Sequence, residues 1–73
     1  MNNWYYVSYN ETYIYPGEKG WQEMVDRIHQ YKHWLVENIG MDNHHTKITN
    51  DGIIGVYIEK EEDALAFKLR FGL

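Results

Sequence analysis

The 73-residue sequence contains no cysteine and only one proline. Without cysteine, the chain forms no disulfide, holds no metal through thiolates and has no cysteine nucleophile. No apolar run approaches the roughly 18 positions of a membrane span, and the first residues lack the basic and apolar regions of a signal peptide. We therefore expect a soluble intracellular protein whose stability rests on its hydrophobic core.

Positive charge is also scarce. Seven Lys and Arg residues stand against eleven Asp and Glu residues, which gives a formal net charge of -4. With this acidic balance, we do not expect the chain to bind a nucleic-acid backbone tightly, because such binding depends on positive side chains that neutralise the phosphates. The length suits one compact domain over residues 1–73, since domains shorter than about 50 residues are rare.

Aromatic residues, in contrast, are abundant. Seven Tyr, three Trp and two Phe make up 16% of the chain. A core this small cannot enclose so many rings and also satisfy every hydroxyl group. We expect some Tyr and Trp side chains at the surface, where such residues favour contacts with partners.

Two segments carry a helical pattern. From Trp21 to Ile39, apolar residues recur on one stripe and polar residues fill the other face, and Gly40 follows as a terminator. A second helix is expected to begin with the acids of residues 61–63 and to end before Gly72, with Lys68 and Arg70 in its last turn. This helix has two apolar stripes: Ala64, Phe67 and Phe71 form one, and Leu65 and Leu69 form the other.

Three segments have the composition of strands. Residues 4–9 are aromatic and β-branched, residues 10–12 resemble a turn, and residues 13–15 either extend the strand or pair back on it. Residues 46–49 and 53–59 flank Asn-Asp-Gly and predict a β-hairpin. A three-residue loop with Gly52 left-handed pairs Ile48 with Ile54 and is preferred over a two-residue turn, because it places apolar side chains on one face.

Together these elements predict an α+β fold in β-α-β-β-α order. The strand over residues 53–59 is the most apolar and is expected at the centre of the sheet. Pairing residues 4–9 with its free edge gives a three-stranded antiparallel sheet in a split βαβ arrangement, with both helices on one face.

Catalytic and metal-binding patterns are weak. His29 and His33 share a helix face at a spacing that suits zinc, but Gln30 occupies the place of a metalloprotease glutamate. The acids of residues 59–63 lie where they cap and solubilise a helix. The sequence has no nucleophile motif and no phosphate-binding loop. We expect no enzyme activity, no cofactor and no metal site.

Trp34 is the most informative single residue. On the helical wheel it lies about 120° from the centre of the apolar stripe, beside Glu23 and Arg27. A Trp in this place either tucks under the C-terminal tail or anchors a protein interface. Trp34, Arg27 and Glu23 are therefore the first predicted partner-binding surface, and Leu65 with Leu69 is the second.

The segment from Tyr57 to Gly72, with its strand, EEDA start and FKLRFG end, resembles small uncharacterised proteins of tailed bacteriophages. Trp21 and Met24, ahead of a helix that carries Trp34, are similar to the same group. The resemblance implies a phage origin and a place in the cytoplasm of an infected bacterial host.

We therefore expect a small phage accessory protein without enzyme activity that binds and modulates or inhibits a host protein, such as a defence factor. Self-association is a related possibility, because a surplus apolar stripe is readily buried between two copies. The alternative is a nucleotide or nucleic-acid binding module that stacks bases on Tyr5, Tyr6, Tyr9 and Tyr57.

Overall fold

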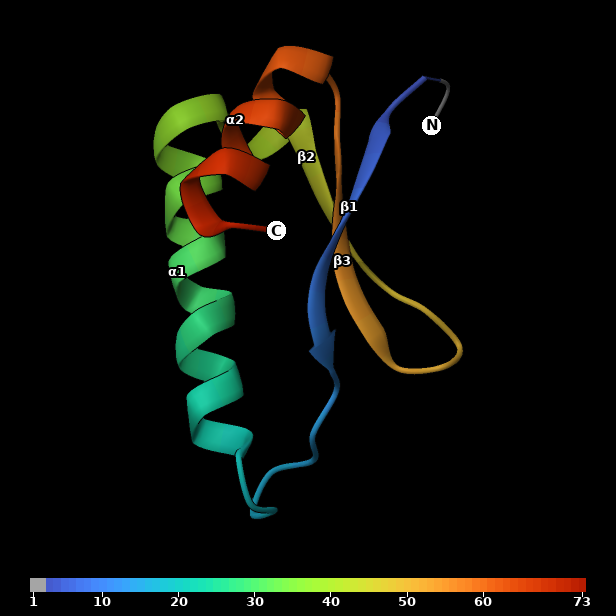
Figure 1. The fold of residues 1–73 in the computed structure, drawn as a ribbon, viewed down its shortest axis with the longest axis vertical. Coiled ribbons are helices and arrows are strands. Elements are labelled where there is room, and N and C mark those ends of the chain that lie inside the picture. Colours follow the sequence, from blue (N-terminus) through green and yellow to red (C-terminus); the bar gives the residue numbers. More distant parts are fainter. Residues whose placement is uncertain (1–2) are drawn as a thin grey trace.

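The structure, a computed structural model, describes residues 3–73 (Figure 1). Three strands form one antiparallel sheet in the order β1-β3-β2, and both helices cover the same face of it. The predicted α+β fold in β-α-β-β-α order is confirmed. Its elements are β1 (Tyr5–Thr12), α1 (Trp21–Ile39), the short 3-10 helix η1 (Met41–Asn43), β2 (His44–Ile48), β3 (Ile53–Ile58) and α2 (Glu61–Phe71).

Helix α1 has the predicted bounds, and four of the residues of its predicted apolar stripe are buried. Met24, Tyr31, Leu35 and Ile39 are buried against the sheet and α2. The helix ends at Gly40, where φ is 86° and the backbone N–H bonds back to the last turn of the helix. A positive φ with a ψ of 165° is favourable only for glycine, so the sequence sets this end of the helix.

The β2–β3 hairpin closes through the predicted three-residue loop. The N–H of Gly52 donates to the carbonyl of Thr49 at 2.9 Å, and the N–H of Thr49 donates to the carbonyl of Ile53 at 2.9 Å. Gly52 has a φ of 81°. The preferred register is confirmed, because the paired residues include Ile48 with Ile54 and Thr46 with Val56.

The predicted turn at residues 10–12 is wrong, because strand β1 continues through it. A bulge interrupts the β1–β3 pairing instead: Ser8 pairs with Gly55, and Glu11 pairs with its neighbour Ile54. Asn10 lies within the bulge with a φ of 59°, a conformation that Asn tolerates better than most residues. The two extra residues let the strand bend and continue along β3.

The core lies between the sheet and the two helices. Its strand side is Val7, Tyr9 and the alternate residues of β3, and its helix side includes Leu35 and Phe67. Phe67 is fully buried, and its ring lies within 6 Å of the ring centroids of Tyr9 and Tyr31. Rings from β1, α1 and α2 therefore meet at one point and fix how the two helices sit on the sheet.

Candidate functional site

Trp34 lies on the flank of α1 that faces α2. Its ring centroid is 5.6 Å from that of Phe67 and 6.4 Å from that of Phe71. The side chain is partly buried against the core. Of the two predicted environments, the structure shows a tucked one, in which Phe67 and Phe71 of helix α2 cover one side of the ring.

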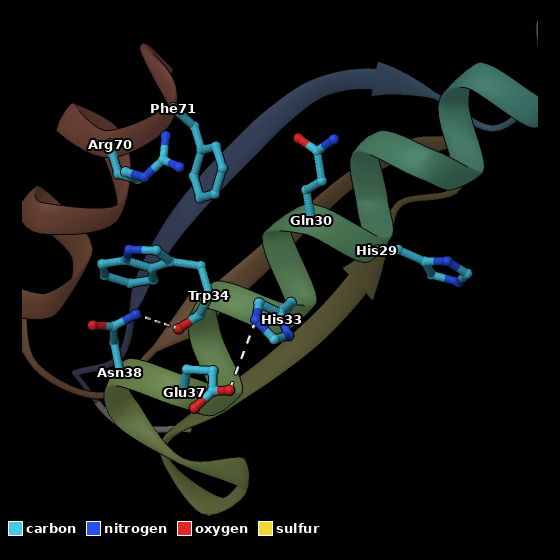
Figure 2. Close-up of a pocket in the computed structure, with 8 residues that line it drawn as sticks. All are labelled: His29, Gln30, His33, Trp34, Glu37, Asn38, Arg70 and Phe71. Atoms are coloured by element: carbon cyan, nitrogen blue, oxygen red, sulfur yellow. Dashed lines mark hydrogen bonds and ion pairs between the residues drawn. The ribbon is translucent and has the colours of Figure 1, made fainter.

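The uncovered side of Trp34 lines a shallow groove of about 520 Å³ between α1 and the end of α2 (Figure 2). Trp34 and Phe71 form its apolar floor, and the Arg70 guanidinium carbon lies 4.9 Å from the centre of the Phe71 ring. We call this surface the Trp34 groove. Its rim is polar and consists of His29, Gln30, His33, Glu37, Asn38 and Arg70.

Figure 2 shows how the rim groups are oriented. Asn38 lies beside the indole, and its side-chain amide donates to the Trp34 carbonyl at 2.9 Å. His29 points away from Trp34, along the helix. His33 and Glu37 form an exposed i,i+4 pair with 3.7 Å between Nε2 and Oε1. Among the rim groups, Asn38 therefore contacts the backbone carbonyl of Trp34, and Arg70 lies beside the Phe71 ring.

Arg27 and Glu23 do not line the Trp34 groove. The Arg27 guanidinium forms a two-pronged ion pair with Glu11 of β1, in which Nη2 donates to Oε1 at 2.9 Å and Nε donates to Oε2. The hydrogen bond to Glu11 raises the pKa of Arg27. Glu23 is exposed on the same helix, one turn before Arg27. Arg27 thus ties α1 to the edge strand β1.

Leu65 and Leu69 form the second predicted surface, and both are exposed. Leu65 is 53% exposed and Leu69 is 85% exposed. They lie on the side of α2 opposite the buried Phe67, because two positions along a helix turn a side chain by about 200°. The structure does not bring them together with Trp34, so they are a separate surface.

A second cleft, which the sequence patterns did not predict, opens between α1 and the edge strand β2. It has a volume of about 310 Å³. The side chains that line it are mostly apolar and come from α1, the hairpin and the β1–α1 loop. They are Tyr13, Pro16, Trp21, Met24, Val25, Ile28, His29, Thr46, Ile48 and Ile54.

This α1–β2 cleft exists because the helix layer covers His44 at the start of β2 but not the rest of the strand. On β3 the helix-facing residues Ile54, Val56 and Ile58 are at most 2% exposed, whereas Ile48 on β2 is 50% exposed. Sequence periodicity assigned Trp21, Val25 and Ile28 to the core stripe. Periodicity shows which side of a helix is apolar, but it does not show how far across the sheet that side reaches.

His44 is the one buried histidine among the described residues. Its Nε2 lies 2.7 Å from the Lys32 ammonium, and its Nδ1 lies 2.8 Å from the Gly40 carbonyl. Since an ammonium only donates, Nε2 accepts and Nδ1 carries the proton. Burial lowers the pKa of His44, and the nearby Lys32 charge adds to this. His44 is therefore held neutral and closes the junction of η1, β2 and α1.

The predicted tyrosine platform is only partly assembled. Tyr6 and Tyr57 pair across β1 and β3, with ring centroids 5.2 Å apart. They lie on the sheet face away from the helices, because Tyr57 alternates with the buried Val56 and Ile58. Tyr5 pairs with the buried Ile58 and so points to the helix side, and Tyr9 is buried. Two of the four rings therefore share the open face.

Metal-ligand side chains do not gather into a group of three or more anywhere in residues 3–73. Within the same residues, neither helix has the length and hydropathy to cross a bilayer. Comparison with known proteins finds no matching family model, no matching curated protein and no matching solved structure. The site residues are therefore interpreted from their own chemistry and geometry.

Proposed function

We propose that this protein is a non-enzymatic binding module that recognises another protein through the Trp34 groove. The observation that carries the proposal is the pairing of a partly open Trp34 with Phe71 and Arg70 in one groove. By the resemblance to phage proteins, the expected partner is a bacterial host protein that is modulated or inhibited during infection.

The composition of the groove supports this function. Protein interfaces are enriched in aromatic residues and Arg at their centres and have polar rims. Here Trp34 and Phe71 supply an apolar floor that is already held in place by Phe67, so little side-chain freedom is lost on binding. The polar groups of α1 on the rim are exposed to water. They suit hydrogen bonds that give a partner its specificity rather than acid–base catalysis, because catalysis benefits from the exclusion of water.

A pair of charge reversals tests the proposal. Arg70→Glu changes the groove, whereas Lys68→Glu makes the same change of charge on a residue of α2 that does not line it. Both side chains are exposed, so both variants should fold. We expect proteins captured from bacterial lysate by the unchanged chain to be retained by Lys68→Glu and lost with Arg70→Glu.

Equal capture by the two variants would contradict the proposal, and so would equal loss. Sedimentation of the purified chain separates the related case of self-association: if the captured partner is a second copy, the assembly should dissociate with Arg70→Glu alone.

The sheet face supports the nucleic-acid alternative less well. Tyr6 and Tyr57 offer two rings on which bases can stack. The neighbouring strand adds one lysine, Lys47, opposite Gly55. Titration with a single-stranded oligonucleotide tests this alternative, and tight binding that weakens with salt and with Tyr6→Ala would favour it over the protein-binding function.

A further inference from the structure

The α1–β2 cleft lies beside a strand edge that is open for pairing. Strand β2 is at one end of the β1-β3-β2 order and pairs with β3 alone. The hydrogen bonds on either side of it fix which backbone groups face β3. The N–H of Thr49 donates to the carbonyl of Ile53, and the carbonyl of Asn43 accepts from the N–H of Glu59.

Backbone groups alternate in direction along an antiparallel strand. Since residues 43 and 49 bond towards β3, residues 45 and 47 do so as well, and His44, Thr46 and Ile48 direct their N–H and C=O groups to the free edge. The N–H of His44 closes the last turn of η1, and within residues 3–73 no hydrogen bond to the other five groups is found. The free edge therefore offers two donors, the N–H groups of Thr46 and Ile48, and three carbonyl acceptors.

The same three residues direct their side chains to the helix side of the sheet. His44 is buried at one end, and Thr46 and Ile48 are exposed in the α1–β2 cleft. Across the cleft, α1 presents Val25 and Ile28. A strand added to β2 would place every second side chain in this cleft, which is the arrangement by which sheet edges recognise extended peptides.

The charge around β2 differs from that of the whole chain. The strand carries Lys47 and His45 on the face away from the helices. The Lys32 ammonium contacts His44, the first residue of the strand, and His29 lines the cleft. Neither β2 nor the lining of the cleft includes an acidic side chain, although Asp and Glu outnumber Lys and Arg in the sequence. The nearest acids by sequence, Asp42 and Asp51, lie beyond the two ends of the strand.

We propose that the edge of β2 and the α1–β2 cleft bind an extended segment of a partner protein as a fourth strand. The segment is apolar at the positions that enter the cleft and acidic at the positions that lie beside His45 and Lys47. This surface shares only His29 with the Trp34 groove, because Val25 and Trp34 are nine positions apart on α1 and face opposite flanks of the helix.

A second copy of this chain suits the surface less well. Two β2 strands paired antiparallel about Thr46 would set Lys47 of each copy beside His45 of the other, without an acid to balance them. The opposite edge of the sheet is also a poorer template, since the bulge in β1 interrupts its regular spacing.

The test uses a capped peptide of alternating valine and glutamate, about seven residues long, which spans β2 at roughly 3.3 Å per residue. It is titrated into the ¹⁵N-labelled full chain. The amide signals of Thr46 and Ile48 should shift, and the exchange of these two amides with solvent should slow roughly tenfold or more on saturation. Two altered peptides serve as controls: one is methylated on the backbone nitrogens that face β2, and the other has lysine in place of glutamate. The dissociation constant of each should be at least about tenfold higher than that of the original peptide.

Two matched substitutions locate the peptide. Ile48→Glu in the cleft should abolish binding, whereas Ile53→Glu should not, because Ile53 is similarly exposed but does not line the cleft. Lys47→Glu should reverse the preference between the glutamate and lysine peptides.

Three results would overturn the proposal. One is the absence of binding at a peptide concentration of about 1 mM. Another is equal binding of the methylated peptide, which would mean that the cleft takes apolar side chains without strand pairing. The third is protection of Thr46 and Ile48 through dimerisation of the free chain. The Trp34 groove is unchanged in all these variants, so the two proposals fail independently.

Discussion

Replacement of Trp34 by alanine should weaken the fold rather than remove only a surface contact. The ring packs against Phe67 and Phe71, both of which belong to the helix that covers the core. Truncation of a fully buried Trp to Ala typically costs about 3–5 kcal/mol. Because one side of Trp34 is open to the groove and the cavity can fill with water, we expect a loss of about 2–3 kcal/mol in the free energy of unfolding.

Urea unfolding followed by circular dichroism measures this loss directly. In a chain of this size, 1 kcal/mol corresponds to roughly 4–8 °C in Tm, so the melting temperature should fall by about 10–20 °C. Trp34→Phe keeps an aromatic ring against Phe67 and should recover most of the loss. Arg70→Ala serves as a control from the rim of the groove and should change stability by less than about 0.5 kcal/mol.

An unchanged urea midpoint for Trp34→Ala would refute this reasoning. It would mean that α2 does not hold the ring in solution and that Trp34 stands in water until a partner covers it. Substitutions at Trp34 could then be used as direct probes of binding.

Three further predictions concern the sheet and the η1–β2 junction. Gly52→Ala should cost about 1 kcal/mol in a denaturant titration, because a Cβ is strained at its positive φ, and Gly52→Asn should cost less. Gly55→Ala should cost about 1–3 kcal/mol in the same titration, because the new Cβ would lie 2.6 Å from Cζ of Tyr6 and 2.7 Å from a carbonyl oxygen of β1. The same change in a Tyr6→Ala background should cost less. An equal cost would show that the Tyr6 ring does not cover Gly55. The lowered pKa of His44 means that the unfolded chain binds its proton more readily, so the free energy of unfolding should decrease as pH falls through the ordinary histidine value of about 6.5. Lys32→Met should raise the pKa of His44 in an NMR titration and reduce that decrease, and an unchanged pKa would show that the Lys32 charge does not act on the imidazole.

The elements that local chemistry decides could be predicted from the sequence. The bounds of α1 follow from an uninterrupted apolar stripe that ends at Gly40. The hairpin register follows from the need of Gly52 for a positive φ and from the pairing of Ile48 with Ile54. In both cases a backbone requirement and the side-chain pattern favour the same arrangement.

The bulge in β1 could not be predicted in this way. Asn10, Glu11 and Thr12 have the composition of a turn, and a local interpretation gives a turn. In the structure, Tyr9 enters the ring cluster and Glu11 pairs with Arg27, so contacts made from distant elements keep the chain extended. Tertiary contacts of this kind override local preference.

For the candidate sites, the sequence could predict only which residues share one face of a single helix. The helical wheel placed Trp34 outside the main stripe, but its neighbours Phe67 and Phe71 are more than 30 positions away and no local rule connects them. The same wheel grouped Arg27 with Trp34, while the structure pairs Arg27 with a residue of β1. The α1–β2 cleft depends on where the helix crosses the sheet, which is a property of the assembled layers.

The pairing of β1 with β3 has a consequence for the order in which the sheet forms. Strands β2 and β3 meet across a three-residue loop, whereas Tyr5 of β1 pairs with Ile58, near the opposite end of the chain. Closing a longer loop costs more chain entropy, and contacts between distant residues form more slowly.

The hairpin and the helices are therefore expected to form first, and β1 to join them last. Until it does so, both edges of β3–β2 are open and the sheet has only two strands, which are marginal by themselves. The packing of Tyr9 in the ring cluster and the Glu11–Arg27 ion pair then hold this last strand in place. The amides of β1 that face β3 should exchange with solvent by the opening of this strand alone, well before the hairpin unfolds.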